Sequence, residues 1–335
     1  MVQETISEWI FTTDQLEHSP SRKDNISSSE ETELRIKTCK FILECANALS
    51  MPQVATSTAW LFFHRFFIRQ SFKSNDRFLL GSTCLFLAGK VSECPHSLNA
   101  IVRTHYQIRK RIDMESTTGD FIKTRQKIIA LERILLHTMA FDLVVILPHI
   151  FMQFWVDEIV KCIPPSFRQN DDAKALKQHA WNFINDASAT SIVLQFDPKA
   201  IAFAAVYLSV LYAGLPDEAI VRQETTDVRQ ETSSVRQEMN GKKECTTRNV
   251  PWWMTKLPVS KEEDFGLSQE TLDAVCSRML ERYKDNPKIP VRISTLLEQY
   301  PTAKRTWKKP QSEANVENGT DKVKPEAKEE TKAEV

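Results

Sequence analysis

Few residues of this sequence have the types and the spacing that catalysis or metal binding requires. Cys94 and His96 could supply half of a tetrahedral zinc site, but no second pair of ligands follows at a suitable distance along the chain. The GxGxxG, GxxxxGK[ST], HExxH and GxSxG motifs, which announce nucleotide, metal or acyl-transfer chemistry, are absent. We therefore expect no metal site, no cofactor and no catalytic residue, and an enzyme is disfavoured.

The remaining polar residues inside apolar segments suggest structural roles. His64 lies in AWLFFHRFF, and Asn185 and Asp186 lie in WNFINDASATS. Buried polar groups normally find hydrogen-bond partners. We therefore expect His64 to be a core histidine with its hydrogen bonds satisfied, and Asn185 and Asp186 to tether a helix to a loop. Seven scattered cysteines without a CxxC pair indicate core thiols in a reducing compartment; they are Cys39, Cys45, Cys84, Cys94, Cys162, Cys245 and Cys276.

The stretch FLAGKVSEC, residues 86 to 94, begins as a buried helix and ends in charge. Lys90 and Glu93 stand where the apolar run stops. A lysine in the last turn of a helix is stabilised by the helix dipole, by roughly 0.3 to 1 kcal/mol, without any partner. From periodicity alone, Lys90 and the later Glu132 are therefore ordinary solvated positions.

Length and composition indicate a globular chain without a long-range electrostatic field. At 335 residues it suits about two domains, and 41% of its residues are apolar. Lys plus Arg equals 44, as does Asp plus Glu, which argues against attraction of nucleic acid, a membrane or acidic substrates by the whole molecule. The N-terminus does not read as a signal peptide. The longest apolar runs, 78–89 and 200–213, are shorter than the roughly 18 to 20 residues that cross a bilayer.

The segments that carry the polar and charged residues named above have apolar residues at helical spacing, and this series of predicted helices starts again after Pro148. The run 77–90 resembles 198–211, since both alternate small and large apolar residues as central helices do, and this alignment places Leu211 opposite Lys90. The expected helices of the first half are 34–49, 53–72, 77–91, 98–111 and 121–143, and those of the second half are 149–163, 171–196, 197–213 and 267–283.

The predicted fold is all-α, with two tandem bundles of about five helices each and a disordered C-terminal tail. The unit VRQE recurs three times in 221–241 with the valine as its only recurring apolar position, which predicts a solvated insertion and not a coiled coil. The tail is too polar to fold alone, although its KRTWKK run could be a nuclear localisation patch. The predicted boundaries are an arm at 1–33, a first bundle at 34–146, a second bundle at 147–290 with an insertion at 216–248, and the tail at 291–335.

Six segments between about Trp9 and Tyr283 form an ordered pattern. They are WIFTTDQLEHSPSR (9–22), MPQVATSTAWLFFHRFFIRQSF (51–72), LFLAGKVSECP (85–95), LERILLHTMAFDL (131–143), AWNFINDA (180–187) and PWWMTKLPVSKEEDFGLSQETLDAVCSRMLERY (251–283). In this order they resemble the cyclin family, so that the two bundles would be cyclin boxes. The opening WIFTTDQL and SPSR, the FHRFF helix and the WW pair resemble the transcriptional branch, of the cyclin T and cyclin K types.

The resemblance implies a kinase-binding site in the first cyclin box. In cyclins, a lysine at the end of the third helix and a glutamate in the fifth bond the kinase beside its mobile helix, and apolar residues pack against the same helix. This chain has Ser92 where the family commonly has the first of two acids. The implied kinase-binding residues are Lys90, Val91, Glu93, Glu132, Leu136, Phe141 and Leu143.

The resemblance also implies a function without catalysis. The chain would be the regulatory subunit of a transcription-type cyclin-dependent kinase, in a nuclear heterodimer that phosphorylates the RNA polymerase II C-terminal domain and promotes elongation. No cofactor, no membrane and no direct nucleic-acid contact are expected. Two alternatives remain open: a cyclin-fold general transcription factor that binds DNA, as in the TFIIB-like group, or a cyclin-like scaffold that activates no kinase.

Overall fold

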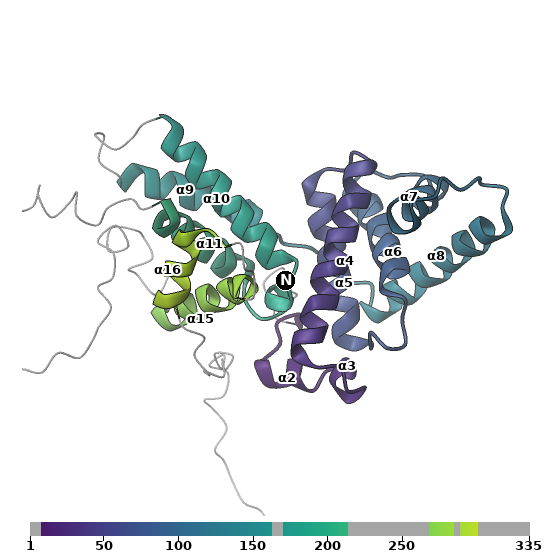
Figure 1. Cartoon of the computed structure of the whole chain (residues 1–335), viewed down its shortest axis with the longest axis horizontal. Coiled ribbons are helices and arrows are strands. Elements are labelled where there is room, and N and C mark those ends of the chain that lie inside the picture. Colours follow the sequence, from purple (N-terminus) through teal and green to yellow (C-terminus); the bar gives the residue numbers. More distant parts are fainter. Residues whose placement is uncertain (1–7, 163–169, 214–267, 285–288, 301–335) are drawn as a thin grey trace, which may run out of the picture.

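The computed structural model describes residues 8–162, 170–213, 268–284 and 289–300, and these form two helical bundles side by side (Figure 1). The first bundle has five long helices preceded by two short ones. They are α2 (Thr13–Glu17), α3 (Pro20–Lys23), α4 (Ser28–Ala48), α5 (Gln53–Arg69), α6 (Arg77–Val91), α7 (Leu98–Lys110) and α8 (Gly119–Thr138). No strand occurs in these ranges, which confirms the all-α prediction.

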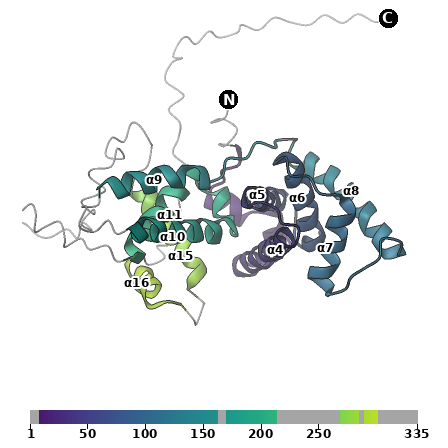
Figure 2. The ribbon, with the colours of Figure 1, turned by 90° about the horizontal axis from the view of Figure 1, so that it is seen from above.

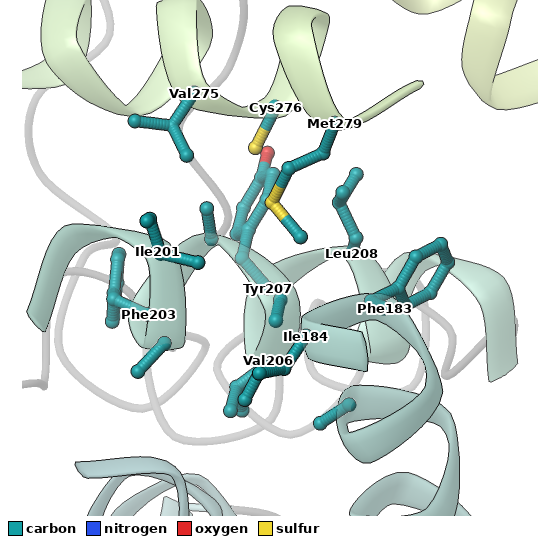
Figure 3. Packing of buried hydrophobic residues seen from close by; sticks show 14 of the residues in the cluster. Phe183, Ile184, Ile201, Phe203, Val206, Tyr207, Leu208, Val275, Cys276 and Met279 are labelled. Carbon is teal, nitrogen blue, oxygen red and sulfur yellow. The ribbon is translucent and has the colours of Figure 1, made fainter. Parts of the chain in front are cut away.

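The second bundle repeats the plan of the first around one central helix. Its helices are α9 (His149–Cys162), α10 (Asn170–Ser188), η2 (Ser191–Leu194), α11 (Pro198–Ala213), α15 (Gln269–Leu280), η5 (Glu281–Tyr283) and α16 (Val291–Gln299). Helix α11 packs against α9, α10, α15 and α16, just as α6 packs against α4, α5, α7 and α8. Figure 3 shows Cys276 and Met279 of α15 pointing onto Tyr207 of α11. The predicted central positions of 77–90 and 198–211 are thus confirmed.

Two predicted boundaries are wrong. Helix α16 lies within the segment assigned to the tail, because Ile293, Leu296 and Tyr300 repeat at helical spacing and are buried in the second core. Helix α4 starts at Ser28, ahead of the predicted start at 34, because the Ser27 side chain caps it by accepting a hydrogen bond from the Glu30 N–H. The predicted insertion, the VRQE repeat and the rest of the tail lie outside the described residues.

A buried hydrogen-bond network, which starts from an ion pair within α4, links the first bundle to the second. Arg35 is 1% exposed and donates to the Glu31 carboxylate at 2.7 Å and to Nδ1 of His64 at 3.0 Å. Nδ1 of His64 therefore accepts, and its Nε2–H donates to the Ser188 carbonyl of the second bundle at 3.0 Å. Burial, together with the charge of Arg35, lowers the pKa of His64 to about 3. The histidine is neutral at physiological pH, and its predicted role as a satisfied core residue is confirmed.

The other predicted structural residues also have partners. The Asn185 side-chain oxygen accepts from Gln53 of α5 at 3.0 Å, and Asp186 accepts from the Tyr283 hydroxyl at 2.6 Å. Of the cysteines in the described residues whose side chains are placed, Cys94 is partly exposed and the others are buried, and none of them forms a disulfide. Among the described helices, none combines the length and the apolar character needed to cross a membrane.

Candidate functional site

The end of helix α6 is shaped by a turn that returns the chain onto Gly89. The Ser92 N–H bonds the Ala88 carbonyl at 2.8 Å and the Cys94 N–H bonds the Gly89 carbonyl at 2.9 Å, while Glu93 takes a left-handed conformation with φ of 56°. Such a residue just after a helix satisfies the last carbonyl groups. His96, which the sequence offered only as half of a zinc site, lies 2.9 Å through its Nε2 from the Leu49 carbonyl oxygen, and no three metal-ligating side chains cluster in the described part of the chain.

Gly89 permits this turn because the chain passes very close to it. A Cβ added to Gly89 would lie 3.0 Å from Cε of Met51 and 3.1 Å from the backbone oxygen of Cys94. The flexible Met51 side chain can move away from an added methyl group. The Cys94 carbonyl cannot, because it belongs to the backbone of the turn. The glycine of the AGKV motif therefore positions the residues that follow it.

We expect Gly89→Ala to lower the free energy of unfolding by roughly 1 to 3 kcal/mol, since the added methyl overpacks a rigid turn. Urea unfolding followed by circular dichroism measures this change. Gly119→Ala is the matched control, because a Cβ there meets no atom within 4 Å and alanine favours the helix. Equal stability of Gly89→Ala and the wild type would show that the turn relaxes without strain.

Helices α6 and α8 bring Lys90 and Glu132 together across 42 residues of sequence. The Lys90 ammonium lies 2.7 Å from Oε1 of Glu132 and 4.0 Å from the centre of the Phe86 ring. The Lys90 side chain is 46% exposed, whereas that of Glu132 is 15% exposed. An exposed ion pair of this kind adds roughly 0 to 1 kcal/mol to stability. It fixes both charges at one point of the surface.

Apolar residues flank both members of this ion pair in the sequence. Val91 follows Lys90, and Leu136 lies one turn after Glu132; both are partly buried against the first core. Ile129 lies one turn before Glu132 and is 51% exposed. Neither motif nor resemblance singled out Ile129, although its spacing of three residues from Glu132 was readable in the sequence.

The turn after α8 presents Phe141 to solvent. Ala140 and Phe141 are both left-handed, with φ of 51° and 59°, and the Phe141 N–H bonds the Leu136 carbonyl at 2.9 Å. Phe141 is 59% exposed and its ring makes an edge-to-face contact with that of His137, with ring centres 5.3 Å apart, whereas Leu143 packs partly against the first core. An exposed phenylalanine held by a fixed turn is a ready anchor for a partner.

The predicted site residues therefore lie on α6, on α8 and on the turns that end these two helices (Figure 2). The structure brings Lys90 and Glu132 into contact, and Val91, Leu136 and Leu143 pack on the same core. Glu93 is exposed on the turn after α6 and makes no ion pair with the described residues. Charged and apolar groups together make a surface suited to protein binding.

Comparison with known proteins identifies the family. Residues 7–144 match the family "Cyclin, N-terminal domain". Cyclin-T1-4 of Arabidopsis thaliana is 34% identical over 294 residues, covering 85% of this chain and 45% of that protein. Cyclin-K of Homo sapiens is 31% identical over 201 residues, covering 60% of this chain and 33% of that protein. The chain thus spans less than half the length of these two relatives.

A further relative supports the assignment, and a solved structure shares the fold. The putative cyclin-T1-1 of Arabidopsis thaliana is 34% identical over 201 residues, covering 60% of this chain and 77% of that protein. A chain in the crystal structure of the yeast RNA Pol II CTD kinase CTDK-1 complex shares the fold, with a TM-score of 0.57 and 17% identity over 90% of this chain and 86% of that one. The chain belongs to the cyclin family, in the transcriptional branch of the cyclin T and cyclin K types.

Proposed function

We propose that this chain is the regulatory subunit of a transcription-type cyclin-dependent kinase, which it binds through the surface around Lys90 and Glu132. The observation that carries the proposal is the ion pair itself, at 2.7 Å, with exposed Ile129 and Phe141 nearby in sequence. Apolar anchors supply most of the energy of an interface, whereas charged groups set register and orientation. The surface offers both.

Activation follows from the way a kinase is built. A protein kinase is active only when its strand lysine pairs with the glutamate of its mobile helix. A partner that binds the inward position of that helix more tightly than the outward position shifts the kinase toward its active state. This chain needs no covalent chemistry of its own. Its requirement is rigidity, which the fixed turns after α6 and α8 help to provide.

The substrate part of the proposal is phosphorylation of the RNA polymerase II C-terminal repeats in the nucleus, which promotes elongation. It is supported by the similarity to cyclins T and K and by the fold shared with a chain of the yeast CTDK-1 complex, an RNA Pol II CTD kinase. In this proposal Glu93 faces the region of the kinase activation loop. Ser92 stands where cyclins commonly have another acid, so this edge of the contact carries less charge.

The test is purification of the tagged chain from its own cells, followed by identification of the co-purifying kinase and reconstitution of the pair. We expect the kinase to phosphorylate polymerase repeat peptides with the chain present and to be nearly inactive without it. Binding without activation would instead support the scaffold alternative. Absence of a kinase, together with steeply salt-dependent binding to promoter DNA, would support a DNA-binding factor.

A further inference from the structure

A polar pocket lies where the short helices α2 and α3 and the start of α4 meet η2 and α15 of the second bundle (Figure 1). It has an empty volume of about 540 Å³, including its open mouth, and about 110 Å³ of this admits the centre of a water molecule. This is room for several waters or for one small polar group. The pocket does not include Lys90 or Glu132, so the proposed kinase contact gives it no role.

Gln195, which lines this pocket, has an unused hydrogen-bond donor. The residue is 4% exposed, and its side-chain oxygen accepts from Nε of Arg278 at 3.1 Å. This bond fixes which end of the amide is the nitrogen, and Nε2 makes no hydrogen bond with the described residues. Nε2 is not one of the fully enclosed atoms that lack a partner in those residues. A group in the pocket can therefore reach it.

Two arginines bring further donors, one from each bundle. Arg22 of α3 donates through Nη1 to a backbone carbonyl at 2.9 Å, and Arg278 of α15 donates to Gln195 through Nε and to Glu281 through Nη1. Nη2 of Arg22 lies 3.6 Å from the Glu31 carboxylate, beyond hydrogen-bonding distance. Nη2 of Arg278 has no partner among the described residues, and neither Nη2 atom is fully enclosed. Both guanidinium groups are thus held in place with one donor nitrogen left over, which preorganises them for a ligand.

The charges of the lining favour an anion over a cation. Arg35 and Glu31 pair with each other at 2.7 Å and largely cancel. Within the lining, Glu17 is then the one carboxylate left to oppose the two arginines just described, although Glu281 offsets part of this charge from outside the pocket. Guanidinium groups with free N–H donors match the geometry of phosphate and carboxylate oxygens.

We propose that this pocket binds a phosphate group, whose terminal oxygens accept from Nη2 of Arg22, Nη2 of Arg278 and Nε2 of Gln195. A phosphate group on a side chain has three strong acceptor oxygens, which match the three unused donors. Because these donors come from both bundles, a bound phosphate ties α3 to α15. Two sources could supply the same group, a phosphorylated side chain of a protein or a small phosphate compound.

Calorimetric titration of the full chain at constant ionic strength tests the proposal and separates the two sources. The probes are acetyl-phosphoserine-amide, inorganic phosphate, acetyl-serine-amide and acetyl-aspartate-amide. We expect saturable binding of a phosphate probe, none of the serine compound, and at least about tenfold weaker binding of the aspartate compound, which has one acceptor oxygen fewer. Binding of the phosphoserine compound at least as tight as that of inorganic phosphate indicates a phosphorylated protein, and tighter binding of inorganic phosphate indicates a small compound. The titration contains no kinase, so its result is independent of the proposed function.

Three variants tie the binding to this pocket. Arg278→Gln removes one unused donor and should weaken the phosphate probe at least about tenfold. Glu17→Gln removes an exposed carboxylate that opposes an anion, so it should tighten binding roughly twofold to fivefold, a gain that loss of structure cannot produce. The control is Arg103→Gln, on a side chain that is 53% exposed and lies outside the pocket, and it should leave Kd unchanged.

Melting curves establish that each variant is folded. Absence of saturable binding by both phosphate probes would overturn the proposal and mean that the pocket holds water alone. Equal binding of the aspartate compound, equal effects of Arg278→Gln and Arg103→Gln, or weaker binding by Glu17→Gln would also overturn it.

Discussion

Arg35→Met should lower the free energy of unfolding by roughly 3 to 5 kcal/mol, the effect of removing one partner from a buried ion pair. The methionine fills much of the space, but it leaves the Glu31 carboxylate without its partner at 2.7 Å. The Glu31 side chain is 8% exposed, and its second oxygen has no hydrogen bond, with Arg22 at 3.6 Å. His64 would lose the donor to Nδ1 as well.

Urea unfolding of the wild type, Arg35→Met and the double variant Glu31→Leu/Arg35→Met tests this prediction. The double variant should be more stable than Arg35→Met, because apolar replacement of a whole buried pair is often neutral or stabilising. Lys37→Met is the matched control: Lys37 pairs with Glu33 at 2.6 Å, but both side chains are more than half exposed. We expect Lys37→Met to lower the free energy of unfolding by less than about 1 kcal/mol. A loss below about 1 kcal/mol for Arg35→Met would mean that water or Arg22 compensates Glu31.

Sequence periodicity was sufficient for the fold because most of the core is apolar at helical spacing. It gave no signal at Arg35, a charged residue in LRIKTCK that is almost fully buried. Its acceptors include the Phe67 carbonyl, 32 residues away, and it reaches the second bundle through His64 and Ser188. No local pattern encodes such a network, because its members meet only after both bundles have formed.

The local sequence likewise predicts only part of the candidate site. Lys90 and Glu132 were assigned through family resemblance, since each separately is an ordinary charged residue near the surface. The outward direction of Phe141 depends on two successive left-handed residues, Ala140 and Phe141. Glycine is the usual residue at left-handed positions, so the alanine and phenylalanine at 140 and 141 did not indicate a left-handed turn. Helix α16 is different, because the spacing of its apolar residues was visible in the sequence.

The largest expected effect on partner binding is at Lys90 and Glu132. In the free chain this pair is a surface ion pair with the Lys90 side chain nearly half exposed, so either alanine variant should fold normally. In the proposed complex, kinase atoms cover the pair and remove water from it. Truncation of one member then leaves a buried charge without its partner, which costs roughly 2 to 5 kcal/mol, or about 30- to 5,000-fold in Kd.

A double-mutant cycle separates this effect from general loss of charge. Kd is measured by calorimetry for the co-purifying kinase with the wild type, Lys90→Ala, Glu132→Ala and the double variant. If the two residues act as one contact, the double variant should lose less affinity than the sum of the single losses, since the second truncation removes a charge already without its partner. Lys40→Ala, on the exposed face of α4, is the control and should stay within about 0.5 kcal/mol of the wild type. Losses below about 0.5 kcal/mol for both single variants would place the kinase on another surface.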